Sequence, residues 1–409
     1  MPGSSSPLRR QVVAAFVGFG AFGSFWGAWG ASVPRIREQA GVTDGELGLA
    51  LLFVGAGALP AMLLAGRALD RWGLKLAALT IGALGTIGAV LAVTSVGMVS
   101  LSAGLALVGV CSGAADVAIN SLAGRVETVA RRPVITRAHG VFSSAVVLAS
   151  LGTGLAYAAS LPPAVPFLGV ALLCLLAAGY LLRALPQVDP RQHEPTAHPR
   201  RHNRPRITPL VLIGVLGALA FASENAHQSW SAVYAHVELQ SSPGLTAVAP
   251  AVFAATVAIT RFSVGGVGAG AAQAVLLAGG LAAGAGALVI AAAPTLVVAI
   301  AGLVVAAAGT AVLFPTLLGI VSRTVEESRR GRATATVTTV AYLGFLLGPV
   351  YVGLWAAAVG LRGAMVAVAA LAVVLVVLTP ALLRLSGLHG PGRDGAAHAA
   401  RPRCRGRAD

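Results

Sequence analysis

The sequence predicts an all-α membrane protein with twelve transmembrane helices in two six-helix bundles. Of its 409 residues, 56% are hydrophobic and only 11% are charged, whereas a soluble domain averages about 25% charged residues. Twelve apolar runs of about 20 residues follow one another, and each is long enough to cross the hydrocarbon core of a bilayer. A polar stretch in the middle of the chain divides these runs into two sets of six.

The expected helices are placed by the apolar runs. The first bundle, residues 11–185, would hold helices at 11–34, 46–66, 76–96, 98–123, 138–158 and 164–185. The second bundle, residues 209–385, would hold helices at 209–234, 244–264, 273–293, 295–321, 333–356 and 363–385. The first run follows two arginines, as a signal peptide does, but it is longer than a signal peptide and many spans follow it. We therefore expect an uncleaved first helix.

Three segments lie outside the predicted bundles. Residues 186–208 are rich in proline, histidine and arginine and hold almost no apolar residues, so they cannot bury enough surface to fold alone. We expect a mobile cytoplasmic linker there, a disordered basic cytoplasmic tail at 386–409, and a cytoplasmic N-terminus at 1–10.

The formal net charge of +15 would suit a nucleic-acid-binding protein, but the distribution of the basic residues argues against one. Among the 29 lysines and arginines, only Arg35, Arg37 and Arg362 fall on one side of the predicted membrane, and all the others fall on the opposite side. Such an asymmetry marks the cytoplasmic side. No basic patch interleaved with aromatic residues indicates RNA or DNA binding.

A hydrophilic stretch between the second and third runs carries a recognisable pattern, Gly66-Arg-Ala-Leu-Asp70-Arg71-Trp-Gly73-Leu-Lys75. Gly66 and Gly73 would permit a tight turn. Asp70 can face the positive end of a neighbouring helix, and Arg71 and Lys75 would hold the loop at the cytoplasmic surface. The pattern resembles the signature loop between helices 2 and 3 of the major facilitator superfamily of transporters. The resemblance implies a gating role for this loop.

Two acidic residues lie well inside apolar runs, where a charge is costly and indicates function by default. Asp116 lies in the fourth predicted helix, and Asn120 follows one turn later on the same face. Glu224 lies near the middle of the seventh predicted helix. A buried carboxylate can take up and release a proton as water access alternates, so Asp116 with Asn120, and Glu224, are candidates for proton coupling or substrate binding. A hydrogen bond to a neighbouring helix is the alternative explanation for each.

Polar and aromatic residues follow Glu224 along the seventh helix. His227 and Gln228 come one turn later and extend a polar stripe, while Trp230 and Tyr234 add aromatic surface. The imidazole could relay a proton, and aromatic rings beside amide groups suit a sugar-like solute. An interhelical hydrogen-bond cluster is the alternative.

The first and fifth helices contribute further candidates. Trp26 and Trp29 follow helical spacing and could line a cavity opposite the seventh helix, although packing or a lipid-facing belt would also explain them. Gly23 and Gly27 have the spacing that lets membrane helices approach closely. His139, at the start of the fifth helix, is a possible gate or a histidine satisfied at a helix end.

The chain lacks the patterns that would indicate an enzyme. Cys111, Cys174 and Cys404 offer neither a disulfide framework nor metal-ligand spacing. There is no Ser/His/Asp set at workable positions and no phosphate-binding Gly-Lys-Ser/Thr loop. We therefore expect no catalytic residue, no cofactor and no metal.

Three further stretches are similar to one subgroup of the superfamily. They are Trp29-Gly-Ala-Ser-Val-Pro-Arg-Ile with Asp44-Gly-Glu-Leu-Gly-Leu-Ala, Ser112-Gly-Ala-Ala-Asp-Val-Ala-Ile-Asn, and His139-Gly-Val-Phe-Ser. They resemble bacterial inner-membrane proteins of the rhizopine-cluster type, which are distantly similar to fucose permeases. In sugar permeases an acid on helix 4 contributes to proton coupling, and Asp116 stands at that place. The resemblance implies a proton-coupled secondary transporter of a sugar, cyclitol or amino-cyclitol in a bacterial plasma membrane. We expect it to work as a monomer in the lipid bilayer.

Two other functions stay open from the sequence. The first is proton-antiport efflux of a drug or secondary metabolite, although Ser150-Leu-Gly-Thr-Gly lacks the proline of the drug-antiporter signature in helix 5. The second is a membrane receptor or scaffold that moves no solute. In the second half, Arg261-Phe-Ser-Val-Gly-Gly-Val-Gly stands where a second signature loop would be, but it has no aspartate.

Overall fold

A computed structural model describes residues 5–185, 207–264 and 268–387. The predicted linker and tail lie outside the described residues, except for the few residues that begin the seventh helix and end the last one. Within the described residues all regular structure is helical, which is what long apolar runs with few polar interruptions predict.

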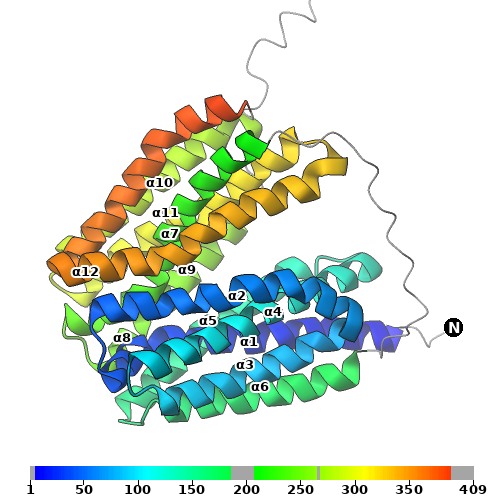
Figure 1. Ribbon diagram of the computed structural model, residues 1–409, viewed down its shortest axis with the longest axis horizontal. Coiled ribbons are helices and arrows are strands. Elements are labelled where there is room, and N and C mark those ends of the chain that lie inside the picture. Colours follow the sequence, from blue (N-terminus) through cyan, green and yellow to red (C-terminus); the bar gives the residue numbers. More distant parts are fainter. Residues whose placement is uncertain (1–4, 186–206, 265–267, 388–409) are drawn as a thin grey trace, which may run out of the picture.

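The first bundle consists of six long helices that pack on one another (Figure 1). They are α1 (Ser5–Ala40), α2 (Asp44–Trp72), α3 (Leu76–Thr94), α4 (Met98–Ala130), α5 (Ile135–Ala158) and α6 (Ala164–Ala184). One close pairing joins α1 to α5. There, a Cβ at Gly23 or Gly27 would lie 2.3 Å from a backbone carbonyl oxygen of α5. The predicted role of these two glycines in close helix approach is confirmed.

The second bundle consists of α7 (Ile207–Val237), the short α8 (Pro243–Thr246), α9 (Val248–Val264), α10 (Ala272–Ala292), α11 (Leu296–Thr324) and α12 (Glu327–Ser386). Within it, α7 packs mainly on α12 and α10 packs on α11. Separate helices also end and begin on either side of Gly97 and of Pro294, where adjacent apolar runs nearly merge in the sequence.

Ten helical stretches of the described residues are long and apolar enough to cross a membrane, and two of them are too long for one crossing. Asp44–Thr94 spans 51 residues and Arg332–Ser386 spans 55, whereas one crossing takes about 20. Each is broken at a glycine with positive φ, Gly73 at 61° and Gly360 at 78°, a conformation that suits glycine because it has no Cβ. Dividing both stretches there gives twelve segments of membrane-spanning length.

The two bundles meet at one end of the molecule and diverge toward the other, as the paths of α2 and α12 show (Figure 1). We call the end that holds residues 35–48, 236–247 and 353–362 the closed end. The opposite end, which holds the start of α1 and the end of α12, is called the open end.

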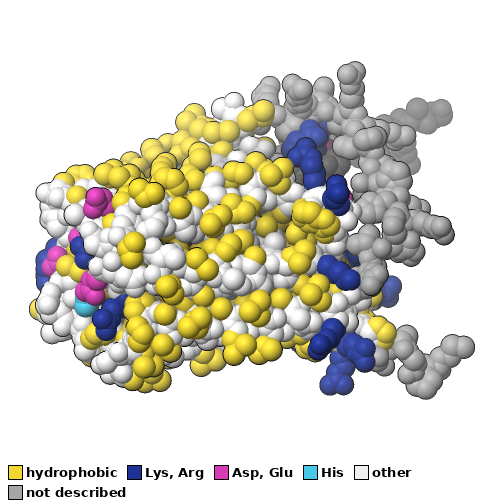
Figure 2. Space-filling view, turned by 60° about the horizontal axis from the view of Figure 1, so that its bottom comes forward, with side chains coloured by type: hydrophobic (Ala, Val, Ile, Leu, Met, Phe, Trp, Pro, Cys, Tyr) yellow, Lys and Arg dark blue, Asp and Glu magenta, His cyan; other side chains and the backbone are white. Residues whose placement is uncertain are grey.

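Charged side chains gather at the two ends, and an uncharged band separates them (Figure 2). Arginine and lysine dominate the visible face of the open end, whereas acidic side chains and a histidine accompany the basic ones at the closed end. This is the distribution that a bilayer imposes, because a charge in the hydrocarbon core is costly.

Candidate functional site

Asp116 lies on α4 with its side chain half-buried. The amide of Asn120, one turn later, donates to Asp116 Oδ1 over 3.1 Å and to its backbone oxygen over 2.9 Å. The carboxylate also lies within electrostatic range of the Tyr342 hydroxyl on α12 of the second bundle. No ion pair of Asp116 occurs among the described residues.

Glu224, on α7, is held by Arg261 of α9. Nη2 of the guanidinium donates to both carboxylate oxygens, over 2.8 and 2.9 Å, and Nε donates to the Ala311 carbonyl of α11 over 3.2 Å. One arginine therefore ties three helices of the second bundle together. The side chain of Arg261 is 40% exposed and that of Glu224 is 15% exposed, so the pair is accessible to water.

Arg261 also reaches toward the first bundle, where its charge lies within electrostatic range of His139 on α5. The imidazole is exposed and packs edge-on against Phe19, with ring centroids 4.9 Å apart. Next to His139, a Cβ at Gly140 would lie 3.3 Å from the ring of Phe262. The charged groups of α7 and α9 thus lie near the face of α5.

An open recess of about 520 Å³ lies beside this contact. It is mostly apolar and is lined by one side of α5 together with a ring from α9: Thr136, Arg137, Gly140, Val141, Ser144, Ala145, Leu148 and Phe262. Neither Asp116 nor Glu224 lines it.

The predicted polar stripe on α7 divides into two faces. Glu224 and Gln228 are half-buried, whereas His227 is 1% exposed and Ser231 is 7% exposed. Around the helix, Glu224 lies about 60° from His227 and Gln228 lies about 60° from Ser231, because each residue turns a helix by about 100°. Packing therefore turns one pair into the bundle and leaves the other pair accessible.

The aromatic candidates are packed rather than accessible. Trp230 is 0% exposed and its Nε1 donates to the Pro349 carbonyl of α12 over 3.2 Å. Tyr234, 2% exposed, donates its hydroxyl to the Ile290 carbonyl of α10. In α1, Trp29 is 5% exposed, and the half-buried Trp26 packs edge-on against neighbouring phenylalanines of the same helix. In this conformation these residues support helix packing.

The predicted signature loop is mostly helix. α2 continues to Trp72, so the turn expected from Gly66 begins only at Gly73, which caps α2 with φ at 61°. Gly66 is an exposed helical residue, and a Cβ there would meet no atom within 4 Å. The expectation that Gly66 permits a turn is wrong, because the apolar face of α2 extends the helix by another turn. Asp70 and Arg71 lie exposed in the last turn of α2.

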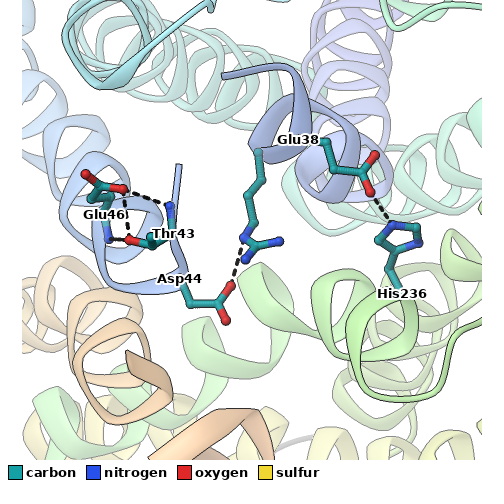
Figure 3. A network of polar contacts seen from close by, with 6 residues as sticks. Glu38, Thr43, Asp44, Glu46 and His236 are labelled. Carbon is teal, nitrogen blue, oxygen red and sulfur yellow. Dashed lines mark hydrogen bonds and ion pairs between the residues drawn. The ribbon is translucent and has the colours of Figure 1, made fainter. Parts of the chain in front are cut away.

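At the closed end, polar contacts surround the entry to α2 and join the bundles (Figure 3). Thr43 and Glu46 cap α2 reciprocally, and Glu38 at the end of α1 lies 2.6 Å from His236 Nε2 at the end of α7. Ser150 of α5 donates to the Ala247 carbonyl over 2.9 Å. The last two contacts bridge the two bundles.

Sequence reasoning missed the roles of Arg261, Tyr342, Glu38 and His236. In the sequence, Arg261 groups with the basic residues of the loops, because it stands at the end of an apolar run. The available signal was its place one helix after an intramembrane acid, since such acids commonly pair with a cation. No cluster of three or more potential metal ligands occurs among the described residues.

Two six-helix bundles that meet at one end, and that hold charged side chains between them, define the class of membrane proteins that move solutes by exposing a central site to each side in turn. The family model for the Major Facilitator Superfamily matches residues 14–271 and 267–403. The chain belongs to the major facilitator superfamily, and it is a transporter rather than an enzyme. The predicted family and the predicted all-α, two-bundle fold are confirmed.

Curated relatives are bacterial. The chain is 27% identical over 330 residues to an uncharacterized MFS-type transporter of Yersinia pestis, covering 78% of this chain and 82% of the relative. It is 29% identical over 354 residues to the uncharacterized transporter y4wD of Sinorhizobium fredii, covering 86% and 92%. It is 25% identical to the membrane protein MosC of Rhizobium meliloti, covering 84% and 83%. The similarity to MosC, a rhizopine-cluster membrane protein, agrees with the subgroup that the sequence motifs resemble.

Solved structures share the fold. A bacterial homologue of the lysosomal transporter Spinster, in an inward-facing and unoccupied conformation, aligns with a TM-score of 0.74 at 14% identity, covering 96% of this chain and all of that one. The inward-open xylose transporter XylE of E. coli aligns with a TM-score of 0.70 at 13% identity, covering 95% and 97%.

Proposed function

We propose that the chain is a proton-coupled transporter of a small polar organic solute of the sugar, cyclitol or amino-cyclitol type. One observation carries the proposal: each bundle holds a carboxylate near the middle of a helix, and each carboxylate interacts electrostatically with the other bundle, either directly or through an arginine. The charge of Asp116 in the first bundle lies within electrostatic range of Tyr342 in the second. Glu224 of the second bundle is bound by Arg261, whose charge reaches His139 of the first.

The Glu224–Arg261 pair suggests how a proton is coupled to movement. A proton and the guanidinium compete for the same two carboxylate oxygens, since Nη2 contacts both. Protonation of Glu224 would release the arginine and loosen the link between α7, α9 and α11. Charge-assisted hydrogen bonds are strong enough to bias a conformational equilibrium, so proton binding would favour one arrangement of the bundles over the other.

Further residues take supporting roles in this proposal. Asn120 and Gln228 are half-buried amides that suit solute hydroxyls. His227, Trp230, Tyr234, Trp26 and Trp29 would shape the site from behind. The α2–α3 connection with Gly66, Asp70, Arg71 and Gly73 would act in gating, and His139 would act as a gate beside Arg261.

We assign the open end to the cytoplasm of a bacterium and the membrane to its inner membrane, so that both termini are cytoplasmic. The excess of arginine at the open end supports this orientation, because basic residues are retained on the cytoplasmic side. The similarity to inward-facing structures supports it as well. The conformation is then inward-facing.

The test is Glu224→Gln in proteoliposomes with an imposed pH gradient. We expect the variant to lose gradient-driven solute accumulation by at least tenfold, because an amide cannot carry the proton, while exchange of labelled for unlabelled solute continues. Glu46→Gln, a change of an exposed carboxylate at the closed end, is the matched control and should accumulate solute normally. Undiminished accumulation in Glu224→Gln would refute the coupling role.

The recess beside α5 favours a second candidate function, export of an amphipathic compound, because its lining is mostly apolar. A thermal-shift panel separates the two functions. A ligand at 100 times its dissociation constant should stabilise the protein by about 2.7 kcal/mol. Stabilisation by polyols or amino-cyclitols supports uptake of a polar solute, whereas stabilisation by lipophilic cations alone supports efflux.

A further inference from the structure

A row of buried polar atoms on α7 has no hydrogen-bond partner. It consists of Ser223 Oγ, both ring nitrogens of His227, and Ser231 Oγ. These residues are spaced four apart, so they lie on one face of the helix. Each side chain is at least nine-tenths buried: Ser223 is 2% exposed, His227 is 1% exposed and Ser231 is 7% exposed.

Other buried hydroxyls in the same protein donate hydrogen bonds to backbone carbonyls of their own helices. Ser32, Thr80 and Thr310 each donate to the carbonyl four residues earlier, over 2.7, 2.8 and 3.0 Å. Ser231 has the same option but does not use it. Its hydroxyl therefore lacks the bond within its own helix that these residues make, and a buried polar group left unpaired is destabilising.

A small cavity is lined by His227 and Ser231. It is bounded by α7, α9, α10, α11 and the second half of α12, and Tyr234, Ala249, Ile290, Ala299 and Met365 are among its lining residues. About 10 Å³ is open to the centre of a water molecule, which is roughly the room that one water needs. Apart from His227, Ser231 and Tyr234, the lining residues are apolar.

We infer that this cavity is a binding site for one ordered water molecule inside the second bundle, held by His227, Ser231 and Tyr234. A buried water typically makes two to four hydrogen bonds. Here the imidazole offers a donor or an acceptor, Ser231 offers both, and the Tyr234 oxygen can still accept after donating to Ile290. A metal ion fits the site less well, since His227 and two hydroxyls form too small a donor set for a hard cation.

Together with Glu224, the site forms a series of polar groups along α7 that runs toward the closed end. His227 lies one turn beyond Glu224, and Ser231 lies one turn further. The inference stands on unpartnered atoms and a cavity, so it does not depend on the solute or on proton coupling.

The direct test is an experimental structure of the full-length protein in lipid, at a resolution that shows ordered water elsewhere in the bundles. We expect a density peak at hydrogen-bond distance, about 2.7–3.2 Å, from a His227 nitrogen and from Ser231 Oγ. An empty cavity in such a map would overturn the inference.

A stability comparison gives an independent readout. Ser231→Ala should lower Tm by about 2 °C, because the water loses a partner and cannot recover it from an apolar wall. Ser24→Ala is the matched control, since that hydroxyl bonds only the Gly20 carbonyl of its own helix and its loss should leave Tm nearly unchanged. A Tm for Ser231→Ala equal to or above that of the parent protein would contradict a bound water.

Discussion

The closed end and the open end hold the two bundles in different ways. At the closed end the backbones themselves approach: a Cβ at Gly48 of α2 would lie 2.8 Å from Gly353 Cα of α12, and one at Gly154 of α5 would lie 2.7 Å from the Gly244 carbonyl oxygen. Toward the open end, the interactions between the bundles involve charged and aromatic side chains. Arg261 of the second bundle, for example, lies within electrostatic range of His139 of the first. The closed end is joined mainly by close backbone contacts, whereas charged and aromatic side chains lie between the bundles toward the open end.

This difference bears on how such a protein can switch. Close-packed backbones form a contact that is either made or broken, since packed interfaces are bistable rather than continuously deformable. Charged groups, by contrast, change their interactions when a proton or solute binds. In a protein with both features, binding of a proton or solute between the bundles can shift the equilibrium between the made and the broken state of the distant backbone contact.

The largest expected effect comes from adding a side chain to the steric contact. Gly48→Leu should keep α2 and α12 apart, because the backbone of Gly353 cannot move aside as a flexible side chain could. Overpacking of this kind costs about 1–3 kcal/mol, or roughly 5–150-fold in the population of the closed arrangement. Spin labels at the exposed Val96 and Val359 should report longer distances, and transport should fall accordingly.

Gly179→Leu on α6 is the matched control for that change, since a Cβ there meets no atom within 4 Å. It should leave both the label distances and transport unchanged. If Gly48→Leu also left the distances unchanged, the glycine contact would not be what closes this end.

The parts that the sequence predicts well are those governed by one helix or one turn. Long apolar runs predict the helices, and Gly73 is predicted as a turn residue and has φ at 61°. Gly23 and Gly27 are predicted to allow close helix packing, and α5 lies against them. In each case the cause is local or repeats with the helical period.

The parts that it predicts poorly depend on which helices become neighbours. Arg261 stands at the end of α9, like a loop residue, but its long side chain turns back to Glu224 on another helix. The polar residues of α7 read as one stripe, yet Glu224 remains accessible and His227 is buried, because faces about 60° apart meet different neighbours. Which of these residues are buried, and which residue pairs with Glu224, depends on how α7 packs against the other helices.

The second prediction concerns the Glu224–Arg261 ion pair of the second bundle. Arg261→Gln should lower stability and transport because it leaves the Glu224 carboxylate without its cation, and Glu224→Gln in the same chain should restore part of the stability. A double-mutant cycle of thermal unfolding should give a coupling of about 1–3 kcal/mol. The same cycle on the more exposed pair Glu326–Arg329 is the control and should give about 0.5 kcal/mol or less. Equal couplings at the two pairs would mean that the Glu224–Arg261 contact has no special strength.

The smallest effect is expected from removing the Glu38–His236 ion pair, which joins the bundles at the closed end. Glu38 and His236 bridge the bundles at 2.6 Å, but their side chains are 47% and 23% exposed, so water weakens the pair to about 0.2–1 kcal/mol. Glu38→Gln should therefore shift the distance between labels at Val96 and Val359 toward the longer population by at most about fivefold, and His236→Asn added to it should change little more. If Glu38→Gln separated the bundles as fully as Gly48→Leu, the ion pair rather than the glycine contact would hold this end closed, and the contrast between the two ends would fail.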